Sequence, residues 1–131
     1  MRVSCCLLLT VSFILFLFSA KSQSWQPLGQ DDFTEASLWR TSNSAITVYG
    51  STPYIVYRND FDGRISVRKF NGNAWEFVGP EGIATSNGML SITTDATGTP
   101  YIAYGDFYNS NKVCVKKIDG SNWVVMVVKP L

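Results

Sequence analysis

The chain has 131 residues, a formal net charge of +1 at pH 7 and no histidine. This length suits one domain, and a charge so close to zero argues against nucleic acid or an anionic membrane surface as the partner, because phosphate binding requires a basic patch. The lack of histidine excludes mechanisms that use imidazole as a base or as a metal ligand.

Residues 1–22 have the features of a secretory signal peptide. Arg2 supplies the positive start, an apolar run follows from Cys5 to Phe18, and small residues such as Ala20 and Ser22 mark a cleavage site. The run is shorter than the roughly 20 apolar residues of a membrane-spanning helix. We therefore expect a secreted, extracellular domain at residues 23–131 with no membrane span after signal cleavage. A signal anchor with delayed cleavage is the alternative.

Only one cysteine remains in the expected mature chain. Cys5 and Cys6 leave with the signal, so Cys114 has no partner for an internal disulfide. Its counterpart in the sequence repeat described below is Ser66, which favours a small, half-buried strand residue. A disulfide between two chains in an oxidising compartment is the alternative.

The first predicted strand of the mature chain covers residues 25–29. It matches residues 75–79, and both segments end at a glycine, where the chain can turn without a Cβ penalty. Residues 30–43 have no close counterpart elsewhere and are predicted to form a solvated loop. Asp31, Asp32 and Glu35 make that loop locally acidic.

One stretch of the sequence then occurs twice. Residues 52–57 and 64–70 match residues 99–104 and 112–118, and the second copy lies 47 residues after the first, or 48 at its end. Self-similarity at such a period is typical of a repeat architecture. Runs of β-forming residues at 45–49 and 90–94 precede the two copies, and each is followed by residues that favour turns.

Two dipeptides predict tight hairpins near the ends of the copies. Asn71-Gly72 and Asp119-Gly120 lie between β-forming runs, and both central residues of such a turn take positive φ. Each copy is therefore expected to form four short antiparallel strands, in units at roughly 44–79 and 90–128. No segment has helical periodicity of sufficient length. The predicted fold class is all-β.

A unit of four strands and nearly 50 residues resembles one blade of a β-propeller. Residues 98–106, followed by 113–117 and 120–123, are similar to the repeat of secreted multi-blade propeller proteins. This resemblance implies two propeller-type blades plus one extra N-terminal strand. It specifies fold better than function, because propellers include lectins, adhesins, scaffolds and enzymes. Fucose-binding lectins of similar design hold the sugar with an arginine and a glutamate, where this chain has Ile55 and Val67, so they are a distant analogy.

Two blades are too few to close a propeller, which has about four to eight. Repeat units of this kind cannot bury their apolar faces alone and need neighbours. We expect either a homo-oligomer, in which a trimer completes a six-bladed ring, or a fragment of a longer propeller protein. The extra strand is either exchanged between subunits or unpaired.

Candidate ligand-binding residues are of three kinds. Two arginines stand where the copies differ, two aspartates lie in polar loops, and two tryptophans recur beside the hairpins. Recurrence favours packing between blades for the tryptophans, although aromatic rings beside polar loops also suit sugar stacking. The candidates are Arg58, Arg64, Asp60, Asp106, Trp75 and Trp123.

No cofactor, metal site or catalytic group is predicted. Residues 59–63 share the acidic character of a calcium loop but lack its terminal glutamate and further ligands, so an ordinary polar turn is favoured. The leading hypothesis is a secreted, non-enzymatic module that binds carbohydrate or an extracellular polymer through a propeller surface. The alternative is a structural extracellular-matrix protein, or a fragment of a longer propeller protein.

Overall fold

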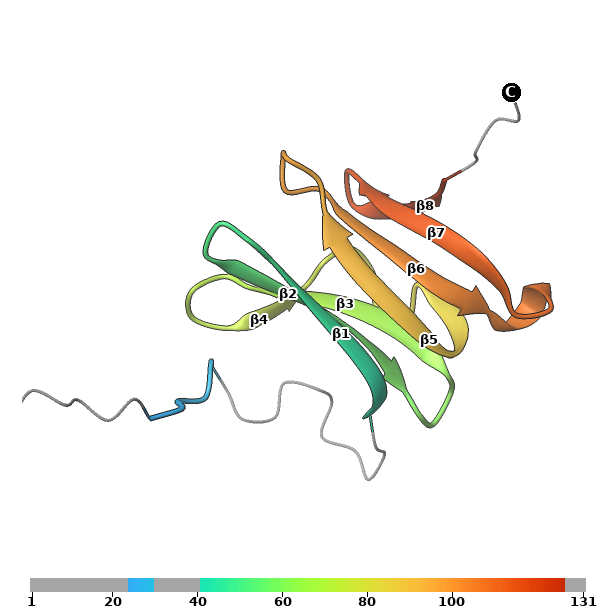
Figure 1. The fold of residues 1–131 in the computed structure, drawn as a ribbon, viewed down its shortest axis with the longest axis horizontal. Helices are drawn as coiled ribbons and strands as arrows, with labels where there is room; N and C mark the ends of the chain where they lie inside the picture. The colour runs from blue at the N-terminus through green and yellow to red at the C-terminus, as the bar shows by residue number, and fades with distance from the viewer. Residues whose placement is uncertain (1–23, 30–40, 127–131) are drawn as a thin grey trace, which may run out of the picture.

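The computed structural model describes residues 24–29 and 41–126, which form an all-β fold (Figure 1). A 3-10 turn, η2 (Phe107–Asn109), connects β6 to β7. The strands are β1 (Thr41–Tyr49), β2 (Thr52–Asn59), β3 (Arg64–Phe70), β4 (Trp75–Phe77), β5 (Ala84–Thr94), β6 (Pro100–Asp106), β7 (Lys112–Asp119) and β8 (Asn122–Val125).

The strands form two antiparallel units in chain order. β1 to β4 make the first unit and β5 to β8 the second, and each strand pairs with the next strand of its unit. The start of β5 also pairs with β3, so the strand order runs β1-β2-β3-β5-β6-β7-β8 with β4 beside β3. Both ends of this order are open. The two predicted four-stranded units are confirmed, in an unclosed sheet that fits an incomplete propeller.

Both predicted hairpins are present, and local hydrogen bonds fix the first of them. Oδ1 of Asn71 accepts from the backbone N–H groups of Asn73 and Ala74 at 3.0 and 2.9 Å, and Gly72 has a φ of 98°. In the second hairpin Gly120 has a φ of 58°. Glycine adopts these positive φ values without a Cβ clash.

β5 is longer than predicted, because it belongs to both units. We expected this strand at 90–94, but it begins at Ala84. Its first residues pair with β3, and residues 90–94 pair with β6 after a register shift between Ser86 and Leu90. Gly88 lies within the shift with a φ of 111°, a conformation that few side chains tolerate.

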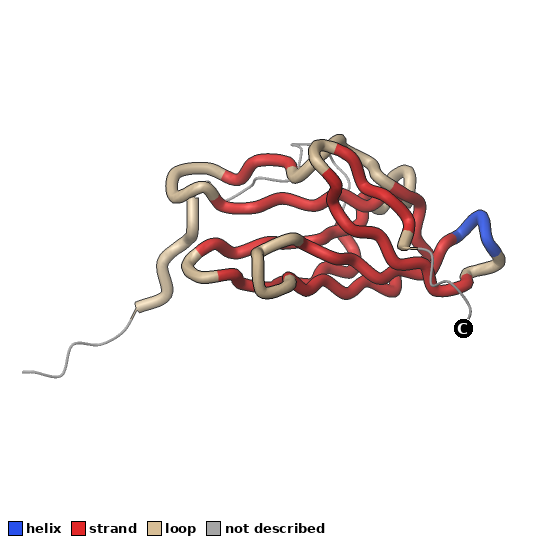
Figure 2. Tube along the Cα trace, turned by 90° about the horizontal axis from the view of Figure 1, so that it is seen from above, coloured by secondary structure: helices blue, strands red, loops and turns tan. Residues whose placement is uncertain are grey.

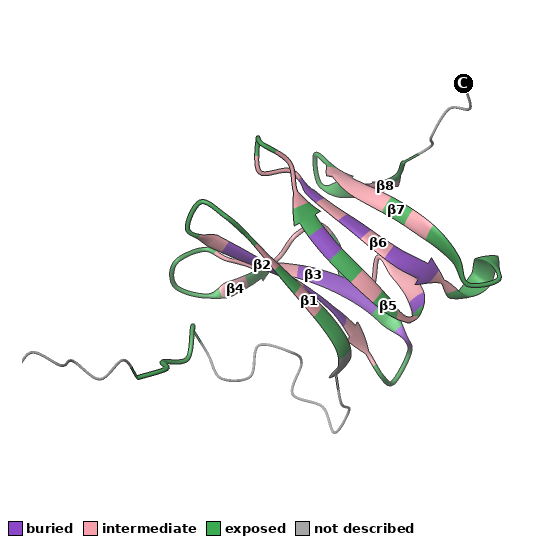
Figure 3. Ribbon diagram, viewed as in Figure 1, coloured by how far each residue is buried: buried purple, intermediate pink, exposed green. Residues whose placement is uncertain are grey.

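The core lies between the two units, which form two layers (Figure 2). Buried and exposed positions alternate along β5 (Figure 3), as they do in a strand with one face in the core. Burying one such aliphatic side chain fully contributes about 1.5–3 kcal/mol. The buried cluster consists of Tyr54, Val56, Ile65 and Val67 from the first unit and Ile92, Ile102, Tyr104 and Trp123 from the second.

Cys114 is a half-buried residue of β7 that packs against this cluster, as the sequence predicted. The predicted signal peptide and the acidic part of the predicted loop, including Asp31, lie outside the described residues. Residues 24–29 are described but form no strand, so the extra N-terminal strand predicted at residues 25–29 is not present. Among the described residues there is no helix with the length and apolarity to cross a membrane.

Candidate functional site

A shallow hollow of about 260 Å³ opens where the two units meet at one end of the sheets. The turn between β2 and β3, the start of β5 and the η2 turn contribute its walls. We call it the loop-end hollow. Its lining consists of Arg58, Asp60, Phe61, Asp62, Gly63, Thr85, Ser86, Phe107 and Tyr108.

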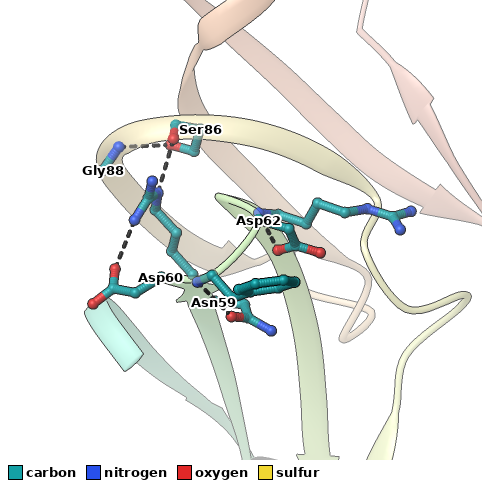
Figure 4. A network of polar contacts seen from close by, with 8 residues as sticks. Asn59, Asp60, Asp62, Ser86 and Gly88 are labelled. Atoms are coloured by element: carbon teal, nitrogen blue, oxygen red, sulfur yellow. Dashed lines mark hydrogen bonds and ion pairs between the residues drawn. The ribbon is translucent and has the colours of Figure 1, made fainter. Parts of the chain in front are cut away.

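Arg58 lines this hollow and links the two units through its contacts with Asp60 and Ser86, which are labelled in Figure 4. Its Nη1 lies 2.7 Å from Oδ1 of Asp60, and its Nε donates to the backbone oxygen of Ser86 at 2.9 Å. The Ser86 hydroxyl in turn accepts from the backbone N–H of Gly88 at 3.1 Å. The two contacts of the Arg58 guanidinium are charge-assisted and are therefore stronger than neutral hydrogen bonds. The guanidinium is therefore held at the boundary between the units.

The turn between β2 and β3 is shaped by two side-chain oxygens. Oδ1 of Asn59 accepts from the backbone N–H of Phe61, and Oδ1 of Asp62 accepts from that of Arg64, both at 2.9 Å. Gly63 has a φ of 70°, and a Cβ there would lie 3.0 Å from Nη2 of Arg58. This geometry leaves the Phe61 ring exposed to solvent at the rim.

The corresponding loop of the second unit brings two more exposed rings to the hollow. Asp106 accepts from the backbone N–H of Tyr108 at 3.1 Å and so caps the η2 turn. The rings of Phe107 and Tyr108 stand edge to face with centroids 5.5 Å apart. Tyr108 is 82% exposed. Three aromatic rings thus lie near a charged pair, with polar and apolar surface in one place.

The structure places only part of the predicted set at this hollow. Arg58 and Asp60 line it, and Asp106 lies beside it as a cap. Arg64 instead points its guanidinium at the backbone oxygen of Gly82, with Nη2 at 2.8 Å, and so fastens the turn between β4 and β5.

The two candidate tryptophans lie away from the hollow. The indole N–H of Trp75 donates to the backbone oxygen of Leu28 at 2.8 Å, and that of Trp123 donates to Val78 at 2.7 Å. Trp123 thus joins the second unit to the first, and Trp75 joins the first unit to residues 24–29.

The aromatic residues of the hollow were missed by the sequence reasoning. A signal for them existed, because the dipeptide Asp-Phe occurs in both loops, as Asp60-Phe61 three residues after Tyr57 and as Asp106-Phe107 two residues after Tyr104. This dipeptide occurs in both copies, whereas Arg58 and Arg64 stand at positions where the copies differ.

Three described groups outside the hollow have shifted pKa values. A hydrogen bond from the Thr97 hydroxyl, with a further bond from the backbone N–H of Thr99, lowers the pKa of Asp95 to about 2. A hydrogen bond from Lys69 lowers the pKa of Glu76, and burial raises the pKa of Tyr104. Within residues 24–29 and 41–126, no three acidic, cysteine or histidine side chains are grouped to hold a metal ion.

Comparison with known proteins gives no relative of this chain. No family model, no curated protein and no solved structure matches it.

Proposed function

We propose that this chain is a secreted, non-enzymatic binding module that recognises carbohydrate or a similar extracellular polymer at the loop-end hollow. The proposal includes membership of the secreted β-propeller repeat proteins, on the basis of the duplicated four-stranded unit. One observation carries the binding role: exposed Phe61, Phe107 and Tyr108 lie beside the Arg58–Asp60 pair in a single hollow.

This combination suits a sugar ring. A pyranose has an apolar face that stacks on aromatic side chains and an edge of hydroxyl groups that hydrogen-bond to charged or polar groups. The hollow is small and open, so one site is expected to bind weakly. Several copies in one assembly would gain avidity without any new contact.

The test is a broad glycan array probed with the secreted protein, followed by calorimetry on any hit. Tyr108→Ala should weaken binding about tenfold, because it removes a stacking surface without touching the core. Asn73→Ala, at the opposite end of the sheets, is the matched exposed control and should bind as the wild type does. An array with no hits at high protein concentration would remove the carbohydrate proposal.

A structural extracellular-matrix protein, or a fragment of a longer propeller protein, is the second candidate. The exposed apolar side chains on the outer sheet faces, such as Ile46 and Val113, favour it, because they suit permanent association. Recovery of the protein only from insoluble matrix would support the structural role, and further copies of the repeat beyond Leu131 in the gene would support the fragment. For a non-enzymatic protein, a screen of hydrolase substrates should give no turnover.

A further inference from the structure

The two units pack on each other through different faces. The first unit presents Tyr54, Val56, Ile65 and Val67, and the second presents Ile92, Ile102, Tyr104 and Trp123. We call the first kind of face the front and the second kind the back. The contact is therefore front to back, and every unit has one face of each kind.

The repeat makes the unoccupied faces easy to identify. On the front faces, Ile65 is 0% exposed in the first unit, whereas its counterpart Val113 is 72% exposed in the second. On the back faces, Ile92 is 8% exposed in the second unit and its counterpart Ile46 is 64% exposed in the first. This leaves an open back face on the first unit and an open front face on the second. They are faces of the same two kinds as those that pack on each other inside the molecule.

A hydrogen bond at the edge of the interface also occurs twice. Trp123 donates to the backbone oxygen of Val78, and a Cβ on the following Gly79 would lie 3.0 Å from its ring. Trp75 donates in the same way to Leu28, and a Cβ on Gly29 would lie 3.4 Å from the Trp75 ring. Residues 24–29 therefore take the place that the outer strand of a preceding unit would occupy.

This segment covers the open back face only in part. Trp25 is fully exposed and Leu28 is half exposed. A hollow of about 450 Å³ remains between Leu28 and the first unit, lined also by Val48, Pro53 and Phe70. A complete neighbouring unit covers Ile92 of the second unit to 8% exposure, whereas Ile46 at the same position of the first unit is 64% exposed.

We infer that copies of this chain associate head to tail, with the back face of the first unit of one copy on the front face of the second unit of another. The outer strand of the other copy, rather than residues 24–29, then accepts the Trp75 hydrogen bond. The acceptor is the backbone oxygen of Met126. Its N–H bonds to the oxygen of Val115 at 2.8 Å, as that of Val78 does to Val67 at 2.9 Å, so Met126 stands at the position of Val78.

Such an interface joins two different surfaces. It closes into a ring if the rotation between copies allows it, and otherwise continues as a filament. Three copies would give six units, within the about four to eight that close propellers. The inference depends on the contact between the units and not on the proposed sugar binding.

Complementation between two variants tests it. Ile46→Glu places a charge on the open back face and Val113→Glu on the open front face, and both positions are exposed, so the fold should be retained. Light scattering should give the mass of a single chain for each variant alone and of two chains for their equimolar mixture. Phe61→Glu, in the loop between β2 and β3, is the control and should associate as the wild type does. Association of either variant alone, or no dimer in the mixture, would overturn the inference.

A second variant tests the role of residues 24–29. Gly29 has a φ of 82°, and a Cβ there would lie 2.9 Å from Phe70, so Gly29→Val should displace the segment from Trp75. Removal of this competitor should tighten association about tenfold. Gln26→Ala, in the same segment, should leave the association unchanged. Single-chain mass for both the wild type and Gly29→Val at high concentration, or weaker association of Gly29→Val, would overturn the inference.

Discussion

At the scale of single residues, the two tryptophans show how one motif serves two environments. Trp123 is buried between the units, while Trp75 is half-buried beside Phe70 and residues 24–29. Each indole donates one hydrogen bond to a backbone oxygen of the preceding segment. The same side chain should therefore contribute differently to stability in the two copies.

Trp123→Phe should lower the free energy of unfolding by about 1–2 kcal/mol, because the ring stays apolar but the oxygen of Val78 loses its buried donor. Trp75→Phe should lower the free energy of unfolding by clearly less, because water can reach the oxygen of Leu28 in this more exposed contact. Urea unfolding followed by circular dichroism measures both values. Equal losses would contradict the different burial of the two rings.

Residue-level chemistry was only partly predictable from the sequence. Arg58 and Asp60 were identified because one differs between the copies and the other lies in a polar loop, and the structure joins them in one ion pair. Arg64 was selected by the same reasoning, yet it binds the backbone at Gly82. A single sequence does not show where a long side chain reaches, because that depends on turns distant in the chain.

At the scale of elements, the turn between β5 and β6 depends on one carboxylate. Oδ1 of Asp95 accepts from the backbone N–H groups of Thr97 and Thr99, each at 2.9 Å, and from the Thr97 hydroxyl at 2.7 Å. These donors favour the charged form, which explains the pKa of about 2. The turn is thus tied to an ionised group.

This group gives the stability a defined pH dependence. The folded pKa is below the unfolded one, so the contribution of Asp95 is fully present above about pH 4 and is lost as the pH falls towards 2. Thr97→Ala removes the largest cause and should raise the pKa of Asp95, measured by NMR titration. In Asp95→Asn this carboxylate is absent. The free energy of unfolding, measured in urea, should therefore fall less between pH 4 and pH 2 than it does in the wild type. An unchanged pKa in Thr97→Ala would contradict the assignment.

The register shift in β5 leads to a second prediction about this element. A Cβ on Gly88 would lie 2.8 Å from Nδ2 of Asn43, and the φ of 111° disfavours any side chain. Gly88→Ala should lower the free energy of unfolding by about 1–3 kcal/mol. Gly72→Ala is the comparison. A Cβ at Gly72 would contact no other atom, so this substitution adds only the backbone strain of a positive φ. Thermal unfolding should show the larger loss for Gly88→Ala.

Most elements could be predicted, because hairpin dipeptides and the internal repeat are local signals. The strand pairs around Asn71-Gly72 and Asp119-Gly120 follow from them directly. The early start of β5 could not be predicted in this way. Ala84 and Thr85 pair with β3, some 20 residues earlier in the chain, and such pairing depends on tertiary packing.

At the scale of the whole molecule, the two units share one core. The buried cluster draws four residues from each unit, so neither unit buries its apolar face alone. Ile102→Ala in the second unit should therefore destabilise both units, by about 2–5 kcal/mol. Circular dichroism and tryptophan fluorescence should report one coincident transition. Two separate transitions would mean that the units fold independently.

The crossing of β5 from one unit to the other also bears on how the chain folds during synthesis. The edge of β3 is completed only when residues 84–86 are in place. During synthesis, the β3–β5 pairing of the first unit can therefore form only after the start of β5 has left the ribosome. Cutting the polypeptide between the two repeat copies would therefore not give two pieces that are each complete.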